Sequence, residues 1–277
     1  MTYFEDSPGI ARIRSSLLHC MHMRTSTLSG IIVTLAIVGG IIFYAATKPL
    51  TAVAPGTAAP LPENGYLEHA AYYDIAANYA TSTPLLADIG PAANAAAVAR
   101  MEAFISDTIA QFKTDGNFAN LTASDIRTMG FDRGRKETLQ IVYLIASSAH
   151  TVSYIYTTYL DTLGAHGNTF FHTFTFDTTT GAPLSLADAF LPGSSYLETL
   201  SGLAREKLPG TIGQGASAQM LDAGTTPDAK NFANFFFDNK DFVVLFAPYA
   251  VAPYAAGTQT LRIPVAQLAA ILKPEYR

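Results

Sequence analysis

The spacing of apolar positions changes several times along the chain, and the first run is apolar throughout. Leu28–Ala46 contains no charged residue. A helix on the surface of a soluble protein would show polar side chains every third or fourth position, whereas a run of this length can cross a hydrocarbon core of about 30 Å. We therefore predict a transmembrane helix over residues 28–46. A signal peptide cleaved near Ala46 is the main alternative.

The next periodic segments predict strands around one long helix. Tyr66–Tyr79 is rich in aromatic and small residues and is predicted as a first strand. Between Pro91 and Asp115, an apolar stripe recurs every three or four positions, which predicts an amphipathic helix. Its five residues are Val98, Met101, Ile105, Ile109 and Phe112. Three strand-like runs separated by turn residues then predict an antiparallel meander. They cover residues 138–147, 151–160 and 169–177.

The C-terminal part adds two helices and further strands. Ser195 and Glu198 have the spacing of a capping box, so a helix is predicted from there to Pro209-Gly210. Residues 213–226 are predicted as a loop. Aromatic runs at 232–237 and 242–246 flank a polar turn and predict a hairpin. A strand over 260–263 and a helix over 265–272 complete an α+β fold, an antiparallel sheet with helices packed on it, preceded by one transmembrane helix.

The flanks of the apolar run predict its orientation. Arg12, Arg14 and Arg24 precede it, whereas only Lys48 follows closely. Because basic residues stay on the cytoplasmic side, residues 1–27 are predicted as a short cytoplasmic segment and the remainder as extracytoplasmic. Residues 47–65 are rich in proline and predict a semi-rigid linker.

Charge and cysteine content exclude several function classes. The net charge is −5, so the chain lacks the excess of basic residues that is typical of a nucleic-acid-binding protein. Three of the 17 basic and two of the 22 acidic residues precede the apolar run, so the remainder carries −6. Cys20 is the single cysteine, which excludes an internal disulfide framework and a multi-cysteine metal site. No nucleotide-binding motif is present, and we expect no cofactor.

The histidines beyond the apolar run do not predict a metal site. His166 and His172 would lie about 20 Å apart on one extended strand, too far to share a metal ion. Gly164–Asn168 instead predicts a hairpin connection, in which the glycines permit positive φ and His166 or Asn168 bonds the turn backbone.

No catalytic residue can be named from the sequence. The G-x-S-x-G nucleophile motif is absent. Paired carboxylates for glycoside cleavage could come from Asp161, Asp177 or Asp188, but turn and cap positions explain these acids more simply.

The segment Ala247–Gly257 repeats the pair Pro-Tyr, at Tyr249 and at Tyr254. Each proline fixes its φ and opposes a central strand, so a stiff loop is predicted. Two alternatives stay open: the tyrosine rings pack back onto the sheet, or they face a ligand or partner at low entropic cost. We predict ligand or partner binding by His166, Asn168, Tyr249 and Tyr254.

Several segments in this order resemble a known extracytoplasmic module. They are GAHGN at 164–168, TFDTTTGAPLSLADAF at 175–190, SYLETLSGLAREKL at 195–208, APYAVAPYAAG at 247–257 and IPVAQLAAILKPE at 263–275. The chain from Tyr66 to Glu275 resembles the module shared by RsiV-type anti-sigma factors and PdaC-type peptidoglycan deacetylases. We divide it into an N-terminal part, 66–163, and a C-terminal part, 164–277.

The resemblance implies an α+β module without catalysis of its own. In the RsiV-type proteins this module binds lysozyme and so starts the release of a sigma factor; in the deacetylases it accompanies a separate catalytic domain. We expect no deacetylase domain here, and the short N-terminus makes sigma-factor capture doubtful. The predicted function is a membrane-anchored, extracytoplasmic ligand-binding or sensing protein with lysozyme or peptidoglycan fragments as partners; the alternative is an anchored hydrolase of wall glycan or peptide.

Overall fold

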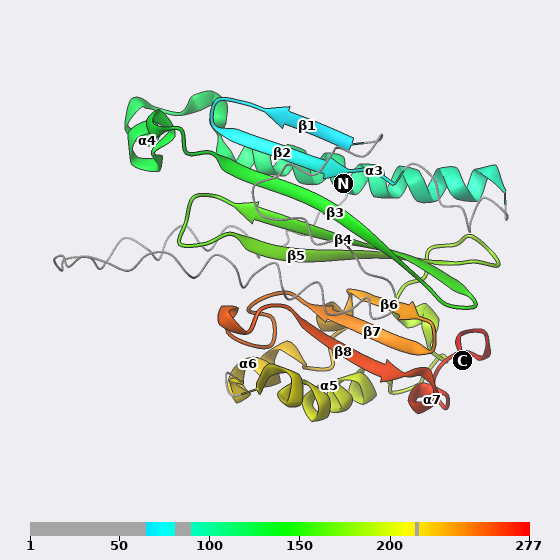
Figure 1. The fold of residues 1–277 in the computed structure, drawn as a ribbon. Coiled ribbons are helices and arrows are strands. Elements are labelled where there is room, and N and C mark those ends of the chain that lie inside the picture. Colours follow the sequence, from blue (N-terminus) through cyan, green and yellow to red (C-terminus); the bar gives the residue numbers. More distant parts are fainter. Residues whose placement is uncertain (1–64, 81–89, 214–215) are drawn as a thin grey trace, which may run out of the picture. The chain divides into compact units, whose positions relative to one another are not determined.

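The computed structural model describes residues 65–80, 90–213 and 216–277 (Figure 1). The predicted cytoplasmic segment, the predicted transmembrane helix and nearly all of the predicted linker lie outside the described residues. Among the residues that are described, no helix combines the length and apolarity needed to cross a membrane.

The first sheet has five strands in the order β1-β2-β3-β4-β5. The predicted meander is confirmed, since β3 pairs antiparallel with β4 and β4 with β5. However, β2 pairs parallel with β3, so this sheet is mixed. The cause is the long helix between these strands, which allows a parallel return. The strands are β1 (Gly65–His69), β2 (Tyr73–Asn78), β3 (Glu137–Ser147), β4 (Thr151–Asp161) and β5 (Asn168–Asp177).

The single strand predicted over residues 66–79 is wrong. The segment is a hairpin in which β1 and β2 pair antiparallel. The amide of Ala70 donates to the carbonyl oxygen of Tyr73 and closes the turn. The turn contains two alanines rather than glycine or proline, so no turn residue marked it in the sequence.

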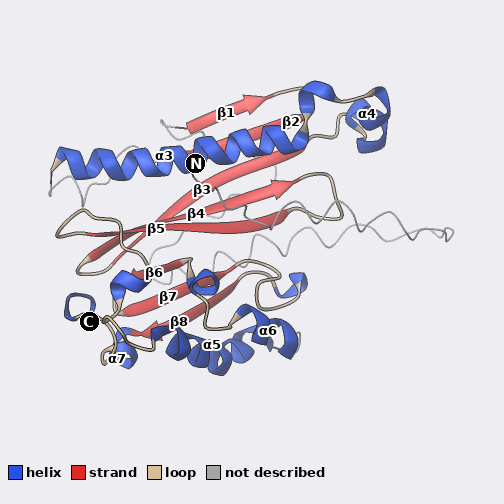
Figure 2. Ribbon diagram, turned by 180° about the vertical axis from the view of Figure 1, so that it is seen from behind, coloured by secondary structure: helices blue, strands red, loops and turns tan. Residues whose placement is uncertain are grey.

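The predicted amphipathic helix is confirmed as α3 (Pro91–Gly116) and lies along one face of the first sheet (Figure 2). Four of the five stripe residues are buried: Met101, Ile105, Ile109 and Phe112. The fifth, Val98, is half-buried, and its neighbour Ala97 takes the buried position.

A second sheet of three antiparallel strands, β6-β7-β8, packs on the other face of the first sheet. Two sheets therefore replace the one sheet that we predicted, within the α+β class. The predicted hairpin is confirmed, with Asn239 at a φ of 53° in its turn. The elements are α5 (Tyr196–Ile212), β6 (Phe235–Asp238), β7 (Asp241–Phe246), β8 (Gln259–Pro264) and α7 (Val265–Leu268).

Three predictions about helices need correction. Helix α5 continues through Pro209 to Ile212. Proline removes only one backbone donor, so near its end the helix can continue past it. The Ser195 side chain makes no capping hydrogen bond. The final helix ends at Leu268 rather than Leu272.

Two short helices were not predicted. They are α4 (Ala123–Met129), which begins with a capping box between Thr122 and Asp125, and α6 (Ala218–Gly224) inside the predicted loop over residues 213–226. Each has only seven residues, too few for an apolar period to become visible.

Two apolar cores hold the layers together. One lies between α3 and the first sheet, and the other between the second sheet and α5. The two sheets meet through a much smaller apolar cluster around Ile155, Phe236 and Val243. A buried polar pair joins them as well, because Thr175 donates to the carbonyl oxygen of Phe235 and bonds the Ser153 hydroxyl.

A carboxylate network ties the β1–β2 hairpin to α3 and predicts a pH dependence. Glu68 accepts hydrogen bonds from Lys113, Tyr66 and Tyr73, which lower its pKa to about 2. Because the pKa of Glu68 is lower in the folded chain, its carboxylate stabilises the fold at pH values above its ordinary pKa of 4.5. This stability is lost as the pH falls toward 2. We expect the urea midpoints of wild type and Glu68→Gln to converge between pH 4.5 and 2. Glu206→Gln, on the exposed surface of α5, should show no such convergence.

Candidate functional site

The loop between β7 and β8 is anchored at its centre and carries its two Pro-Tyr pairs on either side. Val251 is 0% exposed and Ala252 is 2% exposed, so the middle of the loop is buried. Val251 belongs to the apolar core between the second sheet and α5. Tyr249 is 51% exposed, whereas Tyr254 is half-buried. The repeat in the sequence therefore corresponds to two tyrosines flanking a buried anchor.

Both tyrosine rings lie against His166, which comes from the β4–β5 connection. The His166 ring stacks on Tyr254 with 3.6 Å between the ring centroids and 17° between the planes. Tyr249 lies 6.3 Å from His166 and 5.5 Å from Tyr254. We call His166, Tyr249 and Tyr254 the aromatic patch. Its rings stack on one another across two segments that are far apart in the sequence.

Hydrogen bonds fix the orientation of these rings. The Tyr254 hydroxyl donates to the carbonyl oxygen of Gly167 at 2.9 Å, and His166 Nδ1 lies 2.9 Å from the same oxygen. Because a carbonyl oxygen only accepts, Nδ1 carries the proton in the neutral ring. Nε2 is then an acceptor for the Tyr249 hydroxyl, at 3.3 Å.

Gly167 lies in close contact with the Tyr159 side chain, which the sequence did not reveal. A Cβ atom at this position would lie 2.3 Å from the hydroxyl oxygen of Tyr159, whose ring covers the glycine. Burial, Asp161 and Tyr254 together raise the pKa of Tyr159, so its hydroxyl stays neutral. Tyr159 therefore lies against the glycine that follows His166.

Asn168 does not join the patch through any contact found between described residues. It begins β5, and its side-chain oxygen accepts from the amide of Thr169 at 3.0 Å. The structure thus brings together three of the four predicted residues, and it places Asn168 beside them as a strand start.

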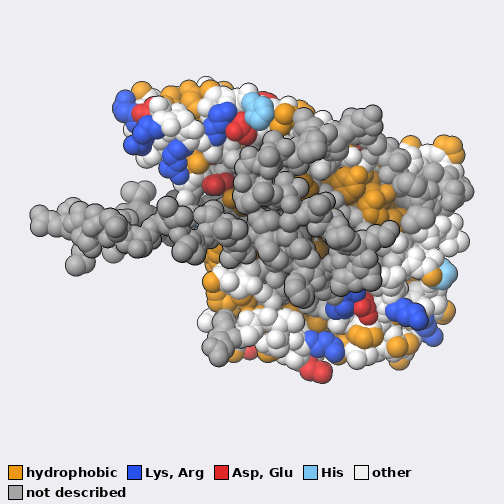
Figure 3. Space-filling view, viewed as in Figure 1, with side chains coloured by type: hydrophobic (Ala, Val, Ile, Leu, Met, Phe, Trp, Pro, Cys, Tyr) orange, Lys and Arg blue, Asp and Glu red, His pale blue; other side chains and the backbone are white. Residues whose placement is uncertain are grey.

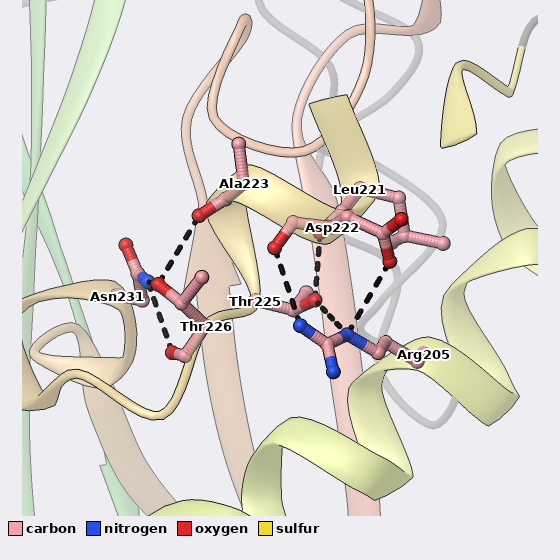
Figure 4. Close-up of polar contacts among 7 residues, drawn as sticks. All are labelled: Arg205, Leu221, Asp222, Ala223, Thr225, Thr226 and Asn231. Carbon is pink, nitrogen blue, oxygen red and sulfur yellow. Dashed lines mark hydrogen bonds and ion pairs between the residues drawn. The ribbon is translucent and has the colours of Figure 1, made fainter. Parts of the chain in front are cut away.

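The far side of the loop rests on the end of α6. A Cβ atom at Gly224 would lie 1.9 Å from the carbonyl oxygen of Ala250, so only glycine permits this contact. Figure 4 shows Arg205 of α5 reaching across to Thr225 and Asp222. Its Nε donates to the Thr225 hydroxyl at 3.2 Å, which holds the chain directly after the glycine. This support could not be recognised from spacing.

The acids weighed for glycoside cleavage hold turns and caps. Asp177 accepts from Thr179, Thr180 and Tyr276, and these bonds lower its pKa against the opposing effect of burial. Asp188 bonds Ser185, and Asp161 accepts from the amide of Leu163.

His166 and His172 lie in different surroundings. The His172 ring stacks on Phe104 and contacts Phe174 at a tilt, and the loss of water there lowers its pKa although the residue is exposed. Within the described ranges, no group of three His, Cys, Asp or Glu side chains is arranged to hold a metal ion.

Comparisons with known proteins identify the C-terminal part of the chain. Residues 187–266 match the family described as "Protein of unknown function (DUF3298)". The peptidoglycan-N-acetylmuramic acid deacetylase PdaC of Bacillus subtilis is 32% identical over 143 residues, which cover 51% of this chain and 31% of PdaC. The chain thus spans about a third of the length of this relative.

Two solved structures are similar to this chain in fold. A DUF3298 family protein from Bacteroides fragilis superposes with a TM-score of 0.50 at 17% identity, covering 76% of this chain and 92% of its own. A second one, from Pseudomonas aeruginosa, gives a TM-score of 0.44 at 16% identity, covering 79% and 97%. The loop with Tyr249 and Tyr254 lies inside the matched residues, whereas His166 precedes them. Residues 187–266 are therefore similar to the DUF3298 family, and the predicted relationship to PdaC-type proteins is confirmed over about half of the chain.

Proposed function

We propose that this chain is a non-catalytic ligand-binding protein of the bacterial cell envelope and that its aromatic patch binds wall glycan. The supporting observation is the stacking of His166, Tyr249 and Tyr254 at the surface, from segments 83 residues apart. The C–H face of a sugar ring is apolar and its rim is polar. Aromatic rings with hydroxyl and imidazole groups at their edges complement both.

The backbone of Tyr249 supports a binding role over a packing role. Its φ is 70°, a left-handed conformation that costs a residue other than glycine about 1–3 kcal/mol. The ring held by this backbone is half exposed and so recovers little of that free energy through burial. Strain that persists without burial is typical of functional positions.

The relationship to PdaC supports the cell wall as the location of the ligand. PdaC is described as a deacetylase of N-acetylmuramic acid in peptidoglycan, and that activity is a property of PdaC. We carry over only the wall glycan as ligand. In this proposal residues 28–46 anchor the chain in the cell membrane, with the N-terminus cytoplasmic and the described unit extracytoplasmic.

The test is co-sedimentation of the full chain with purified peptidoglycan sacculi. We expect Tyr249→Ala to weaken the apparent affinity about tenfold, because the ring contributes exposed contact area and little to the fold. Phe170→Ala is the matched control, since this ring is 43% exposed but lies in β5, outside the patch. Equal binding by wild type and Tyr249→Ala would contradict the proposal.

Two further measurements separate the other functions. Calorimetric titration with lysozyme at low and physiological salt tests the partner that RsiV-type proteins bind. Tight binding to lysozyme without binding to sacculi would mean that the ligand is a protein and not wall glycan. Release of soluble fragments from sacculi, lost in His166→Ala without loss of fold, would support a hydrolase. No carboxylate contacts His166 among the described residues, which favours binding over hydrolysis.

A further inference from the structure

A basic surface lies at one end of the first sheet, although the chain as a whole is acidic. Figure 3 shows Lys and Arg side chains gathered over the α4 end of the molecule. Residues 127–136 contain four basic side chains and one acid, Asp132. The basic side chains are Arg127, Arg133, Arg135 and Lys136.

Two of these four basic side chains form no ion pair between described residues. Lys136 pairs with Asp74 at 3.0 Å, and Arg133 lies 3.7 Å from Asp132. None of the ion pairs between described residues includes Arg127 or Arg135, and both side chains are exposed.

The local backbone holds these like charges close together. Gly130 has a φ of 78° and ends α4, and the chain turns back over it. A Cβ atom there would lie 2.8 Å from Cδ of Arg135 and 3.4 Å from Nη2 of Arg133, so both side chains cover the same glycine. Arg133 Nη2 also donates to the carbonyl oxygen of Arg127. Clustered like charges repel, and a bound anion would relieve that repulsion.

One arginine of the basic surface contacts the connection that carries His166. Arg135 Nη2 donates to the carbonyl oxygen of Leu163 at 3.3 Å, and Leu163 belongs to the same connection as His166. The three residue steps from Leu163 to His166 can span at most about 11 Å. One extended ligand could therefore contact both regions.

We propose that Arg127, Arg133 and Arg135 form a subsite for the carboxylate groups of a peptidoglycan strand whose sugar ring lies on the aromatic patch. This inference rests on the proposed function and narrows it to an acidic glycan. The guanidinium fork fits a carboxylate through two parallel hydrogen bonds. Muramic acid and the stem peptides both carry carboxyl groups. A basic protein such as lysozyme would be repelled at this surface.

The test measures co-sedimentation of the full chain with sacculi from which phosphate-containing polymers have been removed. We expect the double variant Arg127→Gln/Arg135→Gln to bind about tenfold more weakly at low salt and to lose most of the salt dependence of binding. Tyr249→Ala should bind more weakly while keeping that salt dependence. Arg100→Gln, an exposed arginine on α3, is the matched control and should bind like wild type.

Sacculi with amidated carboxyl groups provide the second arm. Wild type should bind them as weakly as the double variant does, and the double variant should lose nothing further. If wild type and double variant bind untreated sacculi equally while Tyr249→Ala is weakened, the carboxylate subsite is wrong and the proposed function stands. If no form binds sacculi, the proposed function fails. Binding that disappears when the phosphate polymers are removed would overturn the choice of carboxylate.

Discussion

Gly224→Ala should destabilise the protein by about 1–3 kcal/mol and weaken its binding to sacculi at least as much as Tyr249→Ala does. The added Cβ would lie 1.9 Å from the carbonyl oxygen of Ala250 and 2.9 Å from Cγ1 of Val251. Neither atom can move away on its own, because Val251 is fully buried and Ala250 directly precedes it in the chain. Overpacking of this kind forces backbone shifts, and here the shift moves the loop that carries both tyrosines. Urea unfolding and co-sedimentation measure the two effects.

Gly202→Ala is the control for this substitution. Gly202 lies within α5, and a Cβ atom there would meet nothing within 4 Å. Alanine should stabilise a helix interior by about 0.5–1 kcal/mol relative to glycine. If Gly224→Ala kept both wild-type stability and wild-type binding, the end of α6 would not position the loop.

The fold was predictable where a period ran long enough to be counted. The helix at Pro91–Gly116 and the strands of the meander extend over ten residues or more, and their predicted bounds agree with the structure within one or two residues. The parallel pairing of β2 with β3 was not predictable, because it depends on how α3 crosses the sheet. The division into two sheets likewise depends on contacts such as Thr175 with Phe235, 60 residues apart.

The site was predictable as a set of unusual residues, but not as a geometry. The repeated Pro-Tyr pair and the glycines around His166 were visible as local chemistry. Their stacking was not, because 83 residues separate His166 from Tyr249. Gly224 and Arg205 had no local signal at all, since each acts through a contact that exists only in the folded chain.

The patch draws its residues from both halves of the fold, which makes binding depend on the smaller junction between them. His166 follows a strand of the first sheet, whereas Tyr249 and Tyr254 follow a strand of the second. Among the described residues, the sheets share a small apolar cluster around Ile155, Phe236 and Val243. Unfolding of the second sheet alone would therefore remove both tyrosines and leave His166 in place.

Phe242→Ala should lower the free energy of unfolding by about 3–5 kcal/mol and should act mainly on the C-terminal half. Phe242 is 0% exposed and packs on Phe190, Phe235 and Phe237, with ring centroids 5.4–5.7 Å away. Its core is separate from the core under α3. In hydrogen exchange, we expect the amides of β6–β8 and α5 to lose protection while those of β3 and β4 keep most of theirs.

Phe170→Ala is again the matched control, and a partly exposed ring on an edge strand should cost less than about 1 kcal/mol. If the amides of both sheets lost hydrogen-exchange protection equally in Phe242→Ala, the two halves would unfold as one cooperative unit through the junction around Phe236. If the halves separate instead, binding to sacculi should disappear at a lower urea concentration than the structure of the first sheet. The loss of binding would then measure the unfolding of the second sheet, because that sheet supplies both tyrosines. His166 alone would offer a sugar only one aromatic ring.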